Sequence, residues 1–349
     1  METYNAGFES IHTIDRSRVY KPNTDTTDQL HFRPVDADIW YPAKNSTGDT
    51  ITVHDLLRLL EKRANYYTAS NAGNGLAAQL ARLFSEGFHC SDSSTLLHFR
   101  TNSFKNAEAA NGKYPIVIYM TAFNGMSYEN FSLFEALAKK GFVVISISSI
   151  GRFPGDMTMK KEDLMEQVND AIVALDVMKQ NPNVDVNKIG IVGYSWGGLA
   201  GALLAGKITG VSCLVSLEGS EYHHYGNAKE ENDDFDTIKN SEEFKNLHLS
   251  APYLRLESSP STTPDKIDSV YNFAANHAPH AQIFSIDSAQ HEDFDCFSLI
   301  TKESGNCPID QRYNSALQLT VDFLADHLKN ENVFSKTVDE RIDKTIRKK

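Results

Sequence analysis

Short apolar runs alternate with helical stretches along the chain from residue 115 onward. The runs are IVIYM, FVVISIS, IGIVGY, VSCLVSL, YLRLE and QIFSID. Helices are expected over Asp163 to Lys179, Pro264 to His277 and Tyr313 to Lys329. Strands that are apolar throughout and separated by helices are typical of a parallel sheet that is covered on both faces. The sequence therefore predicts an α/β fold with a mostly parallel central sheet.

The chain before residue 115 has a different pattern. The segment FRPVDADIWYP places Val35, Ala37, Ile39 and Tyr41 at alternate positions, which is the period of a half-buried antiparallel strand. From about residue 54 to 111 the pattern is helical and polar, with connectors rich in glycine and asparagine. We predict one domain over residues 1–349 with a helical insertion, which acts either as a lid over the site or as a structural cap.

A Gly-x-Ser-x-Gly motif lies where the run IGIVGY ends and the small-residue stretch GGLAGALLAG begins. In such a strand-to-helix turn, Gly193 and Gly197 let the neighbouring backbone approach closely, and Ser195 presents its hydroxyl beyond the carboxyl end of the sheet. The N-terminus of the following helix favours a negatively charged oxygen at the same place. We therefore favour Ser195 as a nucleophile over an ordinary glycine-rich turn.

A serine nucleophile needs a base, and the chain order serine, acid, histidine is expected for this arrangement. His223 and His224 follow the serine too closely, while His277 and His280 lie in or beside a helix before the last strand. His291 lies in the loop that follows the last strand, QIFSID. We predict that His291 is the base, rather than an ordinary surface histidine.

Two glutamates compete for the role of the acid that orients the histidine. Glu257 ends the strand YLRLE, positions 258 to 261 after it hold no ionisable group, and Asp265 is expected to cap a helix. Glu218 directly follows the preceding strand, VSCLVSL, from where it also reaches a histidine at the carboxyl end of the sheet. We favour Glu218 as the acid, with Glu257 as the alternative.

A tetrahedral oxyanion needs two backbone N–H donors. The first is expected from Trp196, the residue after the nucleophile. The second is expected from Phe123, with Ala122 as the next candidate, in the loop that follows PIVIYM. The side chains expected to line the substrate pocket are Met126, Tyr222 and Phe294. For Phe294, packing in the core is an equally good interpretation.

These segments resemble the plasma-type platelet-activating factor acetylhydrolase family, a branch of the α/β hydrolases close to dienelactone hydrolases. The resemblance rests on Gly-Tyr-Ser-Trp-Gly at 193–197, AQHEDFDCFS around His291, DIWYPA near the start, and an acid 23 residues after Ser195. It implies an α/β-hydrolase fold and hydrolysis of short-chain acyl esters, as in lipid degradation. Two positions depart from the family: Glu218 replaces an aspartate, and the oxyanion loop has Thr-Ala-Phe at 121–123 instead of His-Gly.

The charge of the chain narrows the range of partners. With 34 Lys and Arg against 46 Asp and Glu, the net charge is −12, which argues against nucleic acid or an anionic membrane surface. No apolar run reaches the ~18 residues of a membrane span, so we expect no integral membrane association. The basic residues at about 336–349 are expected to form a solvated tail. The segment EYHHY lacks metal-ligand spacing, so we predict no metal and no cofactor.

Four cysteines leave the cellular compartment open. Cys296 and Cys307 bracket a polar loop at a spacing that a disulfide could close, whereas Cys213 lies in an apolar run and is expected to be buried. An oxidised pair would indicate a periplasmic or secreted protein whose signal peptide is absent from this chain. Free thiols would fit a cytoplasmic protein.

Together these features predict a serine esterase that acts on a small-molecule ester substrate. Short-chain acyl esters are the favoured substrates, and bulkier carbohydrate or aromatic esters are the alternative within the same class. A relative that binds a ligand without catalysis is the alternative from another class. It would have no reason to keep Ser195, Glu218 and His291 together. The sequence carries no signal for an oligomeric state.

Overall fold

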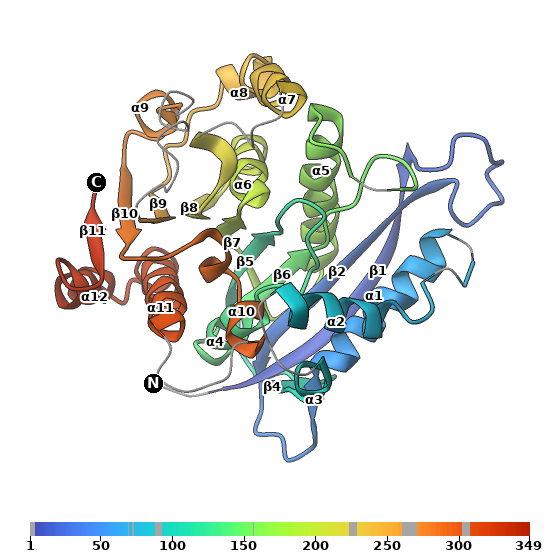
Figure 1. The fold of residues 1–349 in the computed structure, drawn as a ribbon, viewed down its shortest axis with the longest axis horizontal. Helices are drawn as coiled ribbons and strands as arrows, with labels where there is room; N and C mark the ends of the chain where they lie inside the picture. The colour runs from blue at the N-terminus through green and yellow to red at the C-terminus, as the bar shows by residue number, and fades with distance from the viewer. Residues whose placement is uncertain are drawn as a thin grey trace.

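The central strands of the chain lie in one mixed sheet (Figure 1). The structure is a computed structural model that describes residues 4–68, 70–71, 73–87, 93–155, 157–222, 229–259, 271–301 and 308–349. Its strands are β1 Asn5–Val19, β2 Phe32–Ala43, β3 Thr50–Thr52, β4 Arg100–Lys105, β5 Tyr114–Met120, β6 Val143–Ile147, β7 Val184–Tyr194, β8 Val211–Leu217, β9 Tyr253–Ser258, β10 Ala281–Ile286 and β11 Ile346–Lys348. They are ordered β11-β10-β9-β8-β7-β5-β6-β2-β1-β4-β3.

The strands from β6 across to β10 are parallel, as the apolar runs predict. Every residue of β5 and β6 is buried, because helices cover both faces of this part of the sheet. The antiparallel strands β2 and β11 join its two sides. Since parallel strands end at the same edge, the loops after β5, β7, β8 and β10 meet there.

Helices pack on both faces of the sheet (Figure 1). They are α1 Val53–Thr68, α2 Leu76–Gly87, α3 Ser93–His98, α4 Phe131–Lys139, α5 Lys161–Met178, α6 Trp196–Lys207, α7 Lys229–Lys239, α8 Glu242–Lys245, α9 Phe273–His277, α10 Phe297–Thr301, α11 Pro308–Lys329 and α12 Phe334–Arg341. One face packs against α4 and α11, and the other against α5 and α6. In the described ranges, no helix is both long and apolar enough to cross a membrane.

The predicted strand around residues 32–43 is present as β2, but it is buried on both faces instead of one. Its polar residues Asp36 and Asp38 lie under α1. Arg63 of α1 donates to Asp38 at 2.8 Å, and Tyr67 of the same helix donates to Asp36. The helical insertion therefore covers the polar face of β2, and its first helix is fixed there by buried ion pairs.

The insertion at 54–111 is not helical throughout, because its last part, Arg100–Lys105, is the strand β4. This strand pairs in parallel with β1, which the sequence pattern does not predict. Both strands are largely polar, and residues of β1 beyond Phe8 are exposed or only partly buried. Strands of this kind lack the clear apolar alternation on which a prediction depends.

The C-terminal segment is structured, which corrects the predicted solvated tail. It forms α12 and then β11, which pairs antiparallel with β10. Ile346 is fully buried in the core, while Arg347 and Lys348 beside it are exposed. The terminal Lys349 pairs with Glu257 of β9. Ile346, the ladder to β10 and the ion pairs of Arg347 with Asp287 and of Lys349 with Glu257 together hold β11 on the sheet.

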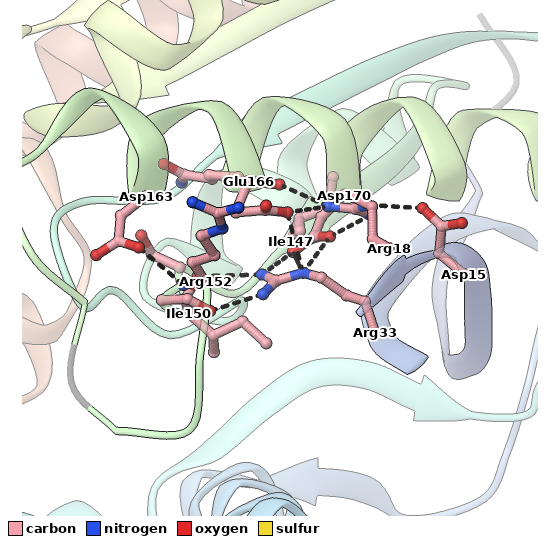
Figure 2. Close-up of polar contacts among 12 residues, drawn as sticks. Asp15, Arg18, Arg33, Ile147, Ile150, Arg152, Asp163, Glu166 and Asp170 are labelled. Atoms are coloured by element: carbon pink, nitrogen blue, oxygen red, sulfur yellow. Dashed lines mark hydrogen bonds and ion pairs between the residues drawn. The ribbon is translucent and has the colours of Figure 1, made fainter. Parts of the chain in front are cut away.

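Buried charges join the β1–β2 hairpin to α5 and to the loop after β6 (Figure 2). The guanidinium group of Arg33 is buried and lies 2.6 Å from the carboxylate of Asp170, which also pairs with Arg18 at 2.7 Å. Arg33 donates in addition to the carbonyl oxygens of Ile150 at 3.1 Å and Gly151 at 2.6 Å. Burial opposes its charge, but Asp170 outweighs burial and raises the pKa of Arg33. These contacts fix the loop after β6.

Candidate active site

Ser195 occupies the tight turn between β7 and α6. Its backbone has φ 53° and ψ −121°, a conformation that side-chain-bearing residues rarely adopt and that is typical of a strained functional turn. A Cβ atom on Gly193 would collide with the carbonyl of Gly197, and one on Gly197 with the carbonyl of Met120. Both glycines of the motif are therefore required, and the geometry is that of a nucleophile elbow.

His291 lies next to the elbow at the start of the short turn His291–Phe294 after β10. Its Nε2 is 3.0 Å from Ser195 Oγ, which is hydrogen-bond distance. The ring of Tyr194 stacks on the imidazole with centroids 5.1 Å apart, and the Tyr194 hydroxyl donates to the His291 carbonyl at 3.0 Å. The motif gives no role to Tyr194, because the residue before the serine varies freely in it. Here Tyr194 contacts the loop of His291 through both its ring and its hydroxyl.

The two candidate acids differ in their partners. Glu218 follows β8 with φ 48°, and its carboxylate accepts hydrogen bonds from the backbone N–H of Ser258 and, at 2.9 Å, from its hydroxyl. Glu257 pairs with Arg255 at 2.9 Å and with Lys349. Burial opposes the charge on Glu257, but these cations outweigh burial and lower the pKa of its carboxyl. Asp265 lies outside the described residues.

The loop after β5 contains Phe123 and Ala122, the two candidates for the second oxyanion donor. The Ala122 N–H donates to the Glu129 carboxyl at 2.9 Å. In the described part of the chain, the Phe123 N–H donates to no acceptor, and the Phe123 ring contacts the Trp196 ring edge-on with centroids 5.8 Å apart. Trp196 is the first residue of α6 and directly follows Ser195. Of the two candidates in this loop, Phe123 is thus the one with an available N–H.

Neighbouring elements hold this loop from outside. Gln167 of α5 donates to the Thr121 carbonyl at 2.9 Å. The Ser149 N–H donates to the Gly125 carbonyl at 3.1 Å. Since Ser149 belongs to the loop after β6, the buried charges of Figure 2 support the oxyanion loop through that neighbour.

The three residues expected to line the pocket differ in their burial. Met126 is half-buried beside the core. Tyr222 and Phe294 are buried in the core, at 8% and 1% exposure, and for Phe294 this is the second of the two interpretations that the sequence allows. Tyr222 is covered by the guanidinium group of Arg255, 4.1 Å from its ring centroid.

His277, Cys213 and Cys296 are buried side chains of the described chain. His277 is a buried core residue that bonds to the Leu247 carbonyl at 2.9 Å. Cys213 is buried, as predicted, and Cys296 is a free buried thiol. The other half of the suggested disulfide, Cys307, lies outside the described residues, as do His223 and His224. Within the described ranges, no cluster of His, Cys, Asp and Glu could hold a metal ion.

Glu129 is a buried acid that the sequence does not reveal as part of the site. Its carboxyl accepts hydrogen bonds from the Ala122 N–H at 2.9 Å and the Tyr119 hydroxyl at 3.1 Å. Burial raises the pKa of Glu129 to about 8, although the hydrogen bond from Ala122 works in the opposite direction. No cation pairs with this carboxyl among the described residues, so at neutral pH it is mostly uncharged.

This pKa predicts a pH-dependent stability. Below the ordinary value of 4.5, Glu129 holds its proton in both the folded and the unfolded state. Between pH 4.5 and about 8 only the folded protein keeps the proton, so the free energy of unfolding falls as pH rises. Relative to wild type, we expect a Glu129→Gln variant to gain about 3 kcal/mol of unfolding free energy between pH 5 and pH 8. Urea unfolding at both pH values measures this, and a pH-independent difference would contradict it.

Comparisons with known proteins give the fold. Residues 101–241 match the model of the Dienelactone hydrolase family, and this segment contains Ser195, Glu218 and the oxyanion loop but ends before His291. No curated relative matches the chain. Among solved structures, the chain is similar to a ferulic acid esterase from Streptomyces cinnamoneus, with 15% identity, 94% of this chain and 91% of that chain covered, and a TM-score of 0.65. The protein has the α/β-hydrolase fold.

Proposed function

We propose that this protein is a serine esterase, a hydrolase of carboxylic esters close to the dienelactone hydrolases, that acts through an acyl-enzyme. The observation that carries the proposal is the 3.0 Å contact between His291 Nε2 and Ser195 Oγ at a strained strand-to-helix turn. A serine hydroxyl becomes a good nucleophile when a base within hydrogen-bond reach accepts its proton. The family match over residues 101–241 is consistent with this chemistry.

The reaction proceeds in two halves. Ser195 Oγ attacks the ester carbonyl carbon and transfers its proton to His291 Nε2, and the N–H groups of Trp196 and Phe123 stabilise the oxyanion. The carbon–oxygen bond to the alcohol breaks as His291 returns the proton to the leaving oxygen. Water then attacks the acyl-enzyme with His291 again as base, which releases the acid and restores Ser195.

Short-chain acyl esters are the proposed substrates. The support is the motif resemblance to plasma-type platelet-activating factor acetylhydrolases, which stays a prediction. Aromatic esters are a second candidate, because the similar structure from Streptomyces cinnamoneus is a ferulic acid esterase. Both candidates use the same Ser195 and His291 and differ only in the acyl group.

A panel of p-nitrophenyl acetate, butyrate and octanoate together with methyl ferulate tests this proposal. We expect kcat/KM for the acetyl ester to exceed that for the octanoyl ester by about tenfold or more, because surplus methylenes that a pocket does not fit weaken transition-state binding. A preference for methyl ferulate would replace the short-acyl proposal by the aromatic one. Failure to hydrolyse every ester would contradict the esterase proposal itself.

Glu218 is the proposed acid of the triad. An acid that orients the histidine and stabilises the imidazolium is worth on the order of 10⁴ in rate, so we expect that loss for Glu218→Gln. Glu257 is engaged with Arg255 and Lys349, so Glu257→Gln should change the rate by less than about tenfold, or ~1.4 kcal/mol of barrier. The measurement is kcat/KM for both variants at pH 8, with folding checked by circular dichroism. A crippled Glu257→Gln beside a nearly normal Glu218→Gln would place the acid one strand later.

A further inference from the structure

Glu129 lies between the two loops that complete the site. It precedes α4, and its carboxyl reaches back to the oxyanion loop, where Oε1 accepts the Ala122 N–H at 2.9 Å. The loop is wrapped closely around this carboxyl, because a Cβ on Gly125 would lie 2.5 Å from Glu129 Oε2. The turn is closed by the Gly125 N–H, which donates to the Ala122 carbonyl at 2.8 Å. The carboxyl thus forms the inner support of this turn.

The backbone of the same residue contacts the histidine loop. The carbonyl oxygen of Glu129 accepts hydrogen bonds from the N–H and the thiol of Cys296, each at 3.3 Å. The next residue, Asn130, donates from Nδ2 to the Phe294 carbonyl at 3.0 Å and accepts from the Tyr313 hydroxyl of α11 at 2.5 Å. Positions 129 and 130 therefore connect the loop of His291 with the loop of Phe123.

The contact to Glu129 occupies one of the two candidate N–H groups of this turn, that of Ala122. An N–H group that already donates to a carboxyl is not available to an oxyanion. Since Ala122 is occupied, the adjacent peptide, that of Phe123, supplies the N–H without a protein acceptor in the described chain. Stabilisation of an oxyanion requires donors held in place before the reaction, about 2.7 to 3.1 Å from the developing charge.

We propose that Glu129 is a positioning residue for ester hydrolysis: its carboxyl holds the Ala122 N–H and thereby directs the Phe123 N–H toward the oxyanion, while its carbonyl anchors the His291 loop. The inference rests on the proposed esterase function. It requires a hydrogen-bond acceptor at position 129 and not a negative charge. A glutamine at position 129 therefore keeps this function, because it has an acceptor oxygen, and a leucine does not.

Glu129→Leu is expected to lower kcat by about 10²-fold with KM nearly unchanged, because a misplaced donor weakens transition-state binding and not substrate binding. Glu129→Gln keeps an acceptor oxygen and should stay within about threefold of wild-type kcat at pH 7. The matched control is Glu135→Leu. Glu135 is also buried, in the middle of α4, but its carboxyl accepts from the Asn102 N–H and the Ser103 hydroxyl of β4, both at 2.6 Å. This control should be destabilised with an unchanged kcat.

Residue-resolved hydrogen exchange of the wild type covers the case in which Glu129→Leu does not fold. The Ala122 amide should be protected in the free enzyme, while the Phe123 amide should exchange fast and become protected once Ser195 carries a phosphonyl group. Equal exchange at the two amides, or a fully active Glu129→Leu variant of an active wild type, would overturn this inference alone. A wild type without ester turnover would overturn the proposed function, and this inference with it.

Discussion

The Ser195→Ala variant is expected to lose ester turnover by on the order of 10⁶-fold, because no other group replaces the attacking oxygen in a serine triad. The fold should persist. Ser195 is only half-buried, and the contacts that hold its turn are made by its backbone, from the Ser195 N–H to the Leu217 carbonyl at 3.0 Å and from the Ser220 N–H to the Ser195 carbonyl at 2.9 Å. Turnover of an acetyl ester by purified protein, with the thermal transition as a check on folding, measures both expectations.

Ser17→Ala is the matched control for this experiment. Ser17 is an exposed serine of β1 that donates to Asp15 on its own strand. Its loss removes one hydroxyl without touching the site, so turnover should equal that of wild type. If Ser195→Ala kept most of the wild-type rate, Ser195 could not be the nucleophile.

The His291→Ala variant is expected to be as severely impaired, on the order of 10⁶ in kcat, because nucleophile and base act as a unit. The wild-type rate should also fall as pH drops below about 6 to 7, where a protonated imidazole no longer accepts the Ser195 proton. Activity of the variant at pH 8 and a wild-type pH profile between 5 and 8 measure these effects.

His280→Ala is the control, since His280 is an exposed histidine just before β10. It should leave both the rate and the pH profile unchanged. A wild-type rate that is flat from pH 8 to pH 5, or an active His291→Ala variant, would exclude His291 as the base.

The parallel part of the sheet follows from sequence patterns because burial on both faces forces its strands to be apolar throughout. The strands at the edges of the sheet cannot be predicted from such patterns. β1 and β4 are polar strands, and β11 has one buried residue, Ile346, within a basic run. In the sequence, the aspartates of β2 indicate a face that is exposed to solvent. In the structure, Arg63 of α1, which is distant in sequence, covers this face.

The site shows the same division between local and long-range information. Gly193, Ser195 and Gly197 lie within five consecutive positions, so the turn can be predicted from steric requirements alone. Phe294 has the same hydrophobic character in a pocket as in the core, and only packing places it in the core. Glu129 is hidden for a different reason. Its role depends on contacts with Ala122 and Cys296, and the latter lies 167 residues further along the chain.

Covalent labelling of Ser195 tests the central claim most directly. A fluorophosphonate forms a stable bond with a serine oxygen only where a base activates that oxygen, and it displaces fluoride as it does so. Intact-mass analysis of the wild type should show one added phosphonyl group, peptide mapping should place it on Ser195, and Ser195→Ala should remain unlabelled. A wild type that stays unmodified, or a label on another residue that persists in Ser195→Ala, would contradict the serine esterase account.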